Sequence, residues 1–281
     1  MSEQAGSAGK TMNEDKTMKG NQTMKEGKTM NREKTAKNAR TKNRIIYAHY
    51  RQEEVQDFLK ASGKQRLDIL FAGATGVGKS STLNSLITAR VSDVGTGVDP
   101  ETSAIKKYCL SRSINLWDTP GLGDSAEADA RYETEILKLL HVKKSNADGT
   151  VSPLIDLVAI IVDGSSREMG TTFKLLTGRL KNLLATRKLL VLINQADCAM
   201  HTHRQVFWKN RKVASPELLT FLDEKAGSVM ERIRESTGFD VERPLCYSAK
   251  YNFNIKKVYD RILDTMMNRQ VSPEEYRAGK A

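Results

Sequence analysis

A glycine-rich loop that contains one lysine and two serines, GATGVGKSS at residues 73–81, directly follows the apolar run 67–72. The spacing G-x-x-x-x-G-K-S between a strand and a helix predicts a loop that binds nucleotide phosphates. Glycines let backbone N–H groups come close to the phosphates, and the next helix directs its positive end toward them. We expect Lys79 to reach the β- and γ-phosphates and the Ser80 hydroxyl to bind Mg²⁺. The predicted phosphate-binding residues are Gly73, Ala74, Thr75, Gly76, Val77, Gly78, Lys79, Ser80 and Ser81.

A second motif, WDTPG at residues 117–121, ends another apolar run. The strand expected here would carry Asp118 to its tip, where a carboxylate can hold Mg²⁺ through a water molecule. Gly121 would let its backbone N–H approach the γ-phosphate and so sense whether that phosphate is present. The nucleotide-binding prediction at this motif covers Asp118, Thr119, Pro120 and Gly121.

The segment between these motifs, GTGVDPETSA at residues 95–104, is rich in glycine and hydroxyl groups. A nucleotide switch needs one hydroxyl that reaches Mg²⁺ while the γ-phosphate is bound and leaves after hydrolysis. We expect Thr102 to supply it, with Ser103 and Thr96 as alternatives. The predicted metal ligands are therefore Ser80, Thr102 and Asp118, and the predicted catalytic residues are Lys79, Thr102 and Gly121.

The identity of the base is predicted by LLVLINQAD at residues 189–197. The Asp197 carboxylate can accept from guanine N1–H and N2–H₂, a donor pair that adenine does not offer, which makes ATP a poor alternative. Asn194 can bind N7 and tie this loop to the phosphate loop, and Gln195 is expected to cover part of the base. A short strand ending at Tyr247 then delivers the tripeptide that should face guanine O6, which is Ser248, Ala249 and Lys250.

Strands and helices alternate behind these motifs. Apolar strands without alternation, separated by helices, predict an α/β fold with a mainly parallel sheet covered by helices on both faces. Ligands of such sheets bind at the carboxyl ends of the strands, where every motif falls. The expected strands are 67–72, 106–110, 113–117, 154–162, 188–193 and 244–247, and the expected helices are 79–89, 126–140, 170–184, 216–236 and 254–268.

Together the motifs resemble the translation-factor-related GTPases and, among them, the Era-like (TrmE-Era-EngA) group. The sequence is most similar to the bacterial ribosome-binding GTPase family, often found in prophage regions, in GKSSTLNSL at 78–86, WDTPGLGD at 117–124 and NQAD at 194–197. The resemblance covers residues 65–270. It implies a Ras-like P-loop G domain that binds GTP with Mg²⁺ as cofactor and slowly hydrolyses it to GDP and phosphate.

Three residues depart from the pattern of related GTPases. Gln195 replaces a lysine that packs on guanine, and Gly76 replaces the asparagine of potassium-activated Era-like enzymes. Leu122 stands where Ras-type enzymes have a glutamine that orients water, so we expect weak intrinsic turnover and a catalytic group from elsewhere. Arg167 is one candidate, acting across a nucleotide-dependent homodimer, and a surface salt bridge is the alternative.

The first 44 of the 281 residues differ in composition from the rest. They contain no Leu, Ile, Val, Phe, Tyr or Trp, and a six-residue repeat is marked by Thr11, Thr17, Thr23, Thr29, Thr35 and Thr41. Eight lysines and three arginines against five acids give this segment a net charge of +6, out of +11 for the chain. We expect a disordered basic tail at 1–44, an N-terminal helix or linker at 45–64, and the G domain at 65–281. The tail suits contact with RNA, the ribosome or an anionic membrane, or it merely adds solubility.

No apolar run approaches the roughly 20 residues that span a bilayer, so a transmembrane segment is not expected. Cys109, Cys198 and Cys246 lack metal-ligand spacing and indicate reduced thiols, which places the chain in the cytoplasm. The leading hypothesis is a GTPase switch whose loops 92–105 and 119–132 change conformation. The alternative is a GTP-binding module of low activity that dimerises or assembles through its nucleotide face.

Overall fold

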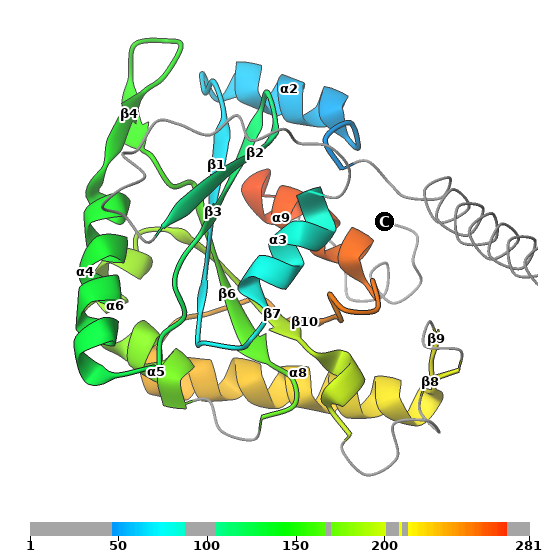
Figure 1. Ribbon diagram of the computed structural model, residues 1–281. Helices are drawn as coiled ribbons and strands as arrows, with labels where there is room; N and C mark the ends of the chain where they lie inside the picture. Colours follow the sequence, from blue (N-terminus) through cyan, green and yellow to red (C-terminus); the bar gives the residue numbers. More distant parts are fainter. Residues whose placement is uncertain (1–46, 88–104, 167–169, 201–207, 210–212, 269–281) are drawn as a thin grey trace, which may run out of the picture. The chain divides into compact units, whose positions relative to one another are not determined.

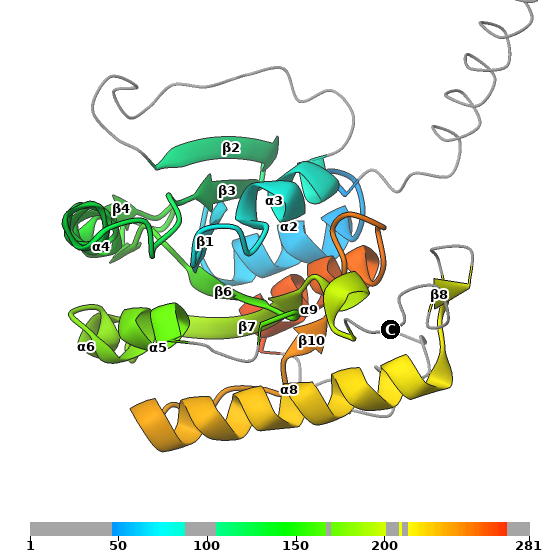
Figure 2. The ribbon, with the colours of Figure 1, turned by 60° about the horizontal axis from the view of Figure 1, so that its bottom comes forward.

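The computed structural model describes residues 47–87, 105–166, 170–200, 208–209 and 213–268. Six strands form the central sheet in the order β10-β7-β6-β1-β3-β2 (Figures 1 and 2). All neighbours pair in parallel except β2, which is antiparallel to β3. The mainly parallel sheet predicted from the sequence is therefore confirmed. Its strands are β1 (Leu67–Gly73), β2 (Lys106–Ser111), β3 (Ile114–Asp118), β6 (Leu157–Asp163), β7 (Lys188–Asn194) and β10 (Leu245–Cys246).

Helices cover both faces of this sheet, as the unbroken burial of its central strands requires. Every residue of β1 and β3 is buried. One apolar cluster packs one face of the sheet against α4 (Ala126–His141), α5 (Gly170–Thr177), α6 (Lys181–Leu184) and α8 (Pro216–Thr237). A second packs the other face against α2 (Gln52–Ala61), α3 (Lys79–Ile87) and α9 (Ile255–Met266).

Local sequence explains where the long helices begin and end. Ser125 caps α4 by accepting a hydrogen bond from the backbone N–H of Ala128 at 3.1 Å. Ser215 caps α8 in the same way, Pro216 occupies its first turn, and Gly238 ends it in the left-handed conformation with φ of 76°.

Helix α2 is part of the apolar core of the described residues. Val55 and Leu59 are buried against the sheet side that α9 also covers. Arg51 joins the two helices, since its guanidinium contacts Asp264 at 2.7 Å and Asp260 at 3.4 Å. The segment from Tyr47 onward therefore packs with the sheet and α9.

Several boundaries differ from the sequence expectation. The expected helix 170–184 is two helices, α5 and α6, which are separated by residues 178–180. The expected strand 154–162 begins only at Leu157. A hairpin before it, formed by β4 (Lys143–Ser145) and β5 (Val151–Pro153), was not predicted, since its short polar strands carry no hydrophobic alternation.

Two further small elements complete the described part of the chain. A second hairpin joins β8 (Trp208–Lys209) to β9 (Val213–Ala214), and a 3₁₀ turn, η1, spans Ala196–Cys198. Within the described ranges, no helix has both the length and the apolar character needed to cross a bilayer. The basic repeat at 1–44 lies outside the described residues.

Candidate functional site

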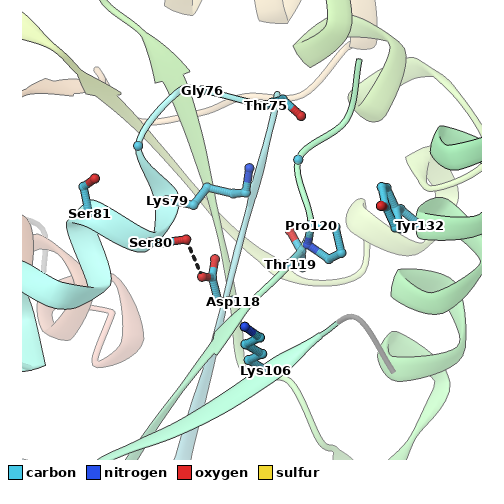
Figure 3. A pocket seen from close by; sticks show the side chains of 12 residues that line it. Thr75, Gly76, Lys79, Ser80, Ser81, Lys106, Asp118, Thr119, Pro120 and Tyr132 are labelled. Carbon is cyan, nitrogen blue, oxygen red and sulfur yellow. Dashed lines mark hydrogen bonds between the residues drawn. The ribbon is translucent and has the colours of Figure 1, made fainter. Parts of the chain in front are cut away.

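The loops that follow β1, β3, β7 and β10 meet at the carboxyl edge of the sheet (Figures 1 and 2). A pocket of about 610 Å³ opens there between the phosphate loop and the loop after β3. Figure 3 shows the twelve residues that line it. Ten are residues that the sequence predicted to bind nucleotide: Thr75, Gly76, Gly78, Lys79, Ser80, Ser81, Asp118, Thr119, Pro120 and Gly121.

The phosphate loop holds its lysine inside the pocket. Lys79 is 6% exposed, and its ammonium donates to the carbonyls of Gly73 at 3.1 Å and Ala74 at 2.9 Å. Burial lowers the pKa of Lys79, and the charges of Asp118 and Asp124 oppose that effect. The loop thus keeps a buried cation bound to its own carbonyls, at the point where phosphate oxygens would be better partners.

Ser80 and Asp118 form an oxygen pair at the base of the pocket. The Ser80 hydroxyl donates to Asp118 Oδ2 at 2.7 Å, as the dashed line in Figure 3 marks. Asp118 Oδ1 is buried and has no hydrogen-bond partner among the described residues. Burial raises the pKa of Asp118, and the Ser80 bond and the charges of Lys79 and Lys106 oppose the rise. A hydroxyl beside a buried, incompletely paired carboxylate fits Mg²⁺, a hard cation that prefers oxygen ligands.

The loop after β3 is fastened directly to the phosphate loop. Leu122 donates from its N–H to the Gly73 carbonyl at 3.3 Å and accepts from the Thr75 N–H at 2.8 Å. A side chain at Gly121 would collide with Thr75, so glycine is what permits this approach. Leu122 itself is 3% exposed and lies in the core, while the Thr119 hydroxyl bonds back to Phe71 of β1 at 2.9 Å.

Asn194 connects the third loop to the phosphate loop. Its side-chain amide donates to the Val77 carbonyl at 2.8 Å and accepts from the Ala249 N–H at 3.0 Å. Gly78, with φ of 89°, lies so close that any side chain there would collide with the Asn194 amide. One buried asparagine therefore joins three of the predicted segments.

The predicted base-recognition residues lie together beside that junction. Ser248 is fully buried, and its hydroxyl donates to Asp197 Oδ1 at 2.7 Å. The Gln195 amide donates to the Gly76 carbonyl at 2.8 Å, from a backbone with φ of 61°. Lys250 is exposed, and its ammonium lies 5.3 Å from the centre of the Tyr251 ring.

Three residues of this region were missed by the sequence reasoning. Lys106 and Tyr132 line the pocket from β2 and α4 (Figure 3). Cys198 donates from its thiol to Asp197 Oδ2 at 3.4 Å. Lys106 and Tyr132 belong to no motif, and only the register of β2 on β3 and the docking of α4 bring them here.

The predicted switch hydroxyl Thr102 lies outside the described residues, as do its alternatives Ser103 and Thr96 and the candidate finger Arg167. Across the ranges that the structure covers, no group of three or more His, Cys, Asp or Glu side chains is arranged to hold a metal ion.

Comparison with known protein families gives one match. Residues 68–195 match the sequence model of a family described as 50S ribosome-binding GTPase. This region contains the phosphate loop, the WDTPG motif and Asn194. No curated protein sequence matches the chain significantly.

The solved structures that match the chain are distant in sequence. Toc33 from Arabidopsis thaliana, in complex with Mg²⁺ and GMPPNP, is 16% identical over 81% of this chain and 98% of its own, with a TM-score of 0.51. A structure of chloroplast translocon components, described with the statement that dimerization is important for the GTPase activity of atToc33 and psToc159, is 19% identical over 78% of this chain and 91% of its own, with a TM-score of 0.50. A probable GTP-binding protein engB is 22% identical over 72% of this chain and 100% of its own, with a TM-score of 0.44.

The described residues therefore have the Ras-like fold, and residues 68–195 match a GTPase family model. The sheet order and the pocket at the carboxyl edge agree with this fold.

Proposed function

We propose that this protein is a GTP-dependent molecular switch that hydrolyses GTP to GDP and phosphate and changes conformation between the two states. The observation that carries the proposal is the Asn194 junction, which ties the phosphate loop, the NQAD loop and Ala249 into one site. A single buried amide could not satisfy these contacts unless the three segments were shaped as a unit.

Different residues of the pocket contact the phosphates and the metal ion. Lys79 exchanges its carbonyl partners for the β- and γ-phosphate oxygens, and the Gly121 N–H approaches the γ-phosphate. Ser80 and Asp118 hold Mg²⁺, which neutralises charge on the phosphate oxygens when bound. Thr102 remains our candidate for a third ligand.

The residues beside the junction recognise guanine. Asp197 accepts from N1–H and N2–H₂, and the Ser248 hydroxyl fixes the direction of its carboxylate. Asn194 reaches N7 and the Ala249 N–H faces O6. Gln195 covers part of the base, and its hydrogen bond to the Gly76 carbonyl holds the Gln195 side chain next to the phosphate loop.

Phosphate release measured with time tests the enzymatic half of the proposal. With Mg²⁺ we expect slow release from GTP and little release from ATP, and Lys79→Ala should abolish the GTP signal. Release that Lys79→Ala leaves unchanged would come from another enzyme in the preparation. If the protein is a switch, the fluorescence emission of Trp117, which is next to Asp118 in the sequence, should differ between the protein bound to GDP and the protein bound to a non-hydrolysable GTP analogue.

A second candidate is a GTP-binding module that dimerises through its nucleotide face and has little activity alone. The burial of Leu122 supports it, because no side chain at that position is available to orient water. The chloroplast GTPases whose dimerization is described as important for activity offer a parallel. Turnover per molecule that rises with protein concentration would favour the dimer, and a constant rate would favour the monomeric switch.

Association with the ribosome or another RNA is the further part of this proposal. The matched family is described as ribosome-binding, and residues 1–44 carry a net charge of +6 in sequence. A cationic segment suits contact with the phosphate backbone of RNA.

A further inference from the structure

Lys106 is a pocket lysine that no nucleotide motif contains. It is the first residue of β2, and it lies directly opposite Asp118 in the antiparallel pairing of β2 with β3. Side chains that oppose each other in an antiparallel pair project from the same face of the sheet. Figure 3 shows the Lys106 ammonium directed toward Asp118 from the strand below it.

The next residue, Lys107, takes the opposite direction. It pairs with Trp117, and its ammonium lies 5.2 Å from the centre of the indole ring. Successive residues of a strand face opposite sides of a sheet, so two adjacent lysines have separate surroundings. Lys106 lines the pocket and Lys107 does not.

The two lysines of the pocket, Lys79 and Lys106, lie on different sides of it. Lys79 is held at the phosphate-loop end by the carbonyls of Gly73 and Ala74. Lys106 approaches from the other side, next to Asp118 and the proposed metal position, and its charge acts on the Asp118 carboxylate. A nucleoside triphosphate differs from a diphosphate by one phosphate. In the proposed binding mode this terminal phosphate, with its additional negative charge, would lie toward Asp118 and Lys106. A cation here interacts with that charge and much less with the more distant phosphates.

We infer that Lys106 is a specificity-determining residue, whose ammonium contacts the terminal phosphate of GTP and makes the pocket favour the triphosphate over the diphosphate. The inference rests on the proposed function, because it requires that the pocket bind guanine nucleotides. It also supplies, from within the same chain, a second positive charge near the terminal phosphate.

Equilibrium titration with fluorescent GDP and with a fluorescent non-hydrolysable GTP analogue, both with Mg²⁺, tests the assignment. Lys106→Gln removes the charge and leaves a somewhat shorter, neutral polar side chain. We expect the Kd for the triphosphate analogue to rise about tenfold, which corresponds to about 1.4 kcal/mol, and the Kd for GDP to stay within about twofold. The loss should shrink as ionic strength rises, because the contact is electrostatic.

Two variants provide matched controls. Lys107→Gln removes the same charge from the adjacent residue and should leave both affinities unchanged, whereas Lys106→Arg should keep the preference for the triphosphate. Unchanged triphosphate affinity in Lys106→Gln would overturn the inference while leaving the proposed function intact. Equal weakening of both nucleotides would also overturn it, since that result indicates a structural role. A wild-type protein that binds neither nucleotide would overturn the proposed function together with the inference.

Discussion

At Asp118, burial and neighbouring groups act in opposite directions on one carboxylate. Burial raises its pKa, and the Ser80 hydroxyl and two lysines favour the ionised form. A pKa above the unfolded value means that the folded state disfavours the charge. Its stabilising contribution is present below the unfolded pKa and is lost as the pH rises through the folded pKa. At neutral pH the charged carboxylate therefore costs stability in the nucleotide-free protein.

Asp118→Asn should for this reason stabilise the nucleotide-free protein. We expect the free energy of unfolding in urea at neutral pH to rise by about 1 kcal/mol, a typical gain when a functional site is neutralised. Ser80 can still donate to the amide oxygen, so the local structure should persist. The additional stability that Mg²⁺ and a GTP analogue give the wild type should be absent in the variant. A less stable variant would contradict this reading of the site.

Asp197→Asn tests the base assignment. The amide nitrogen of asparagine would face the donors of guanine, whereas it can donate to the oxygen that xanthine carries at C2. Loss of a hydrogen bond to a charged group costs about 1.5–3 kcal/mol, so GTP affinity should fall roughly 10- to 100-fold. Competition between GTP and xanthosine triphosphate should shift toward the latter. Retained preference for guanine would show that another residue reads the base.

Residue types and spacing could predict the motif residues of the pocket, because local sequence alone places a P-loop lysine or a strand-end carboxylate. Lys106 could not be predicted in the same way. The position of Lys106 depends on the register of β2 against β3. A shift of one residue would turn Lys106 away from the pocket and place Lys107 there instead.

Among the elements, the unpredicted β4–β5 hairpin is fastened to the end of the sheet opposite the nucleotide site. Lys144 donates to Asp68 and Asp156 at 2.8 Å each, and both carboxylates are almost fully buried. Asp68 also accepts from Asn115 and from the Trp117 indole. The network thus connects the hairpin to β1, β3 and β6.

Lys144→Ala should destabilise the fold, because it removes a shared cation from two buried carboxylates. Breaking a buried ion pair costs about 3 kcal/mol, which urea denaturation can measure. Lys143→Ala is the matched control, since this neighbouring lysine is exposed and its removal should change stability by at most about 0.5 kcal/mol. Equal effects of the two variants would show that the buried network contributes nothing specific.

At the level of elements, hydrophobic runs and caps could predict most of the sheet and the long helices. The runs of β1 and β6 are continuous because helices bury both sides of them. The β4–β5 hairpin could not be predicted, because ion pairs formed with residues far away in sequence hold it rather than an apolar pattern. The break between α5 and α6 inside the expected helix 170–184 was not predicted either.

For the whole molecule, the charge of residues 1–44 leads to a prediction about RNA. Compared with the full chain, a chain that begins at Arg44 should bind RNA more weakly and with a shallower dependence on salt. Each phosphate contact that is lost reduces the slope of log K against log salt by about 0.7–0.9. Filter binding at two salt concentrations measures both quantities. Equal affinities and equal slopes would show that the N-terminal segment does not contact RNA.

The central claim is that the loops at the carboxyl edge of the sheet form one site for a guanine nucleotide and Mg²⁺. Isothermal titration calorimetry of the full chain with GDP, a non-hydrolysable GTP analogue and the matching ATP analogue tests it most directly. We predict one bound guanine nucleotide per chain, tighter triphosphate binding with Mg²⁺ than with a chelator, and adenine affinity weaker by roughly 100-fold or more. Absence of a binding signal with both guanine nucleotides, or equal affinity for the adenine analogue, would contradict the account.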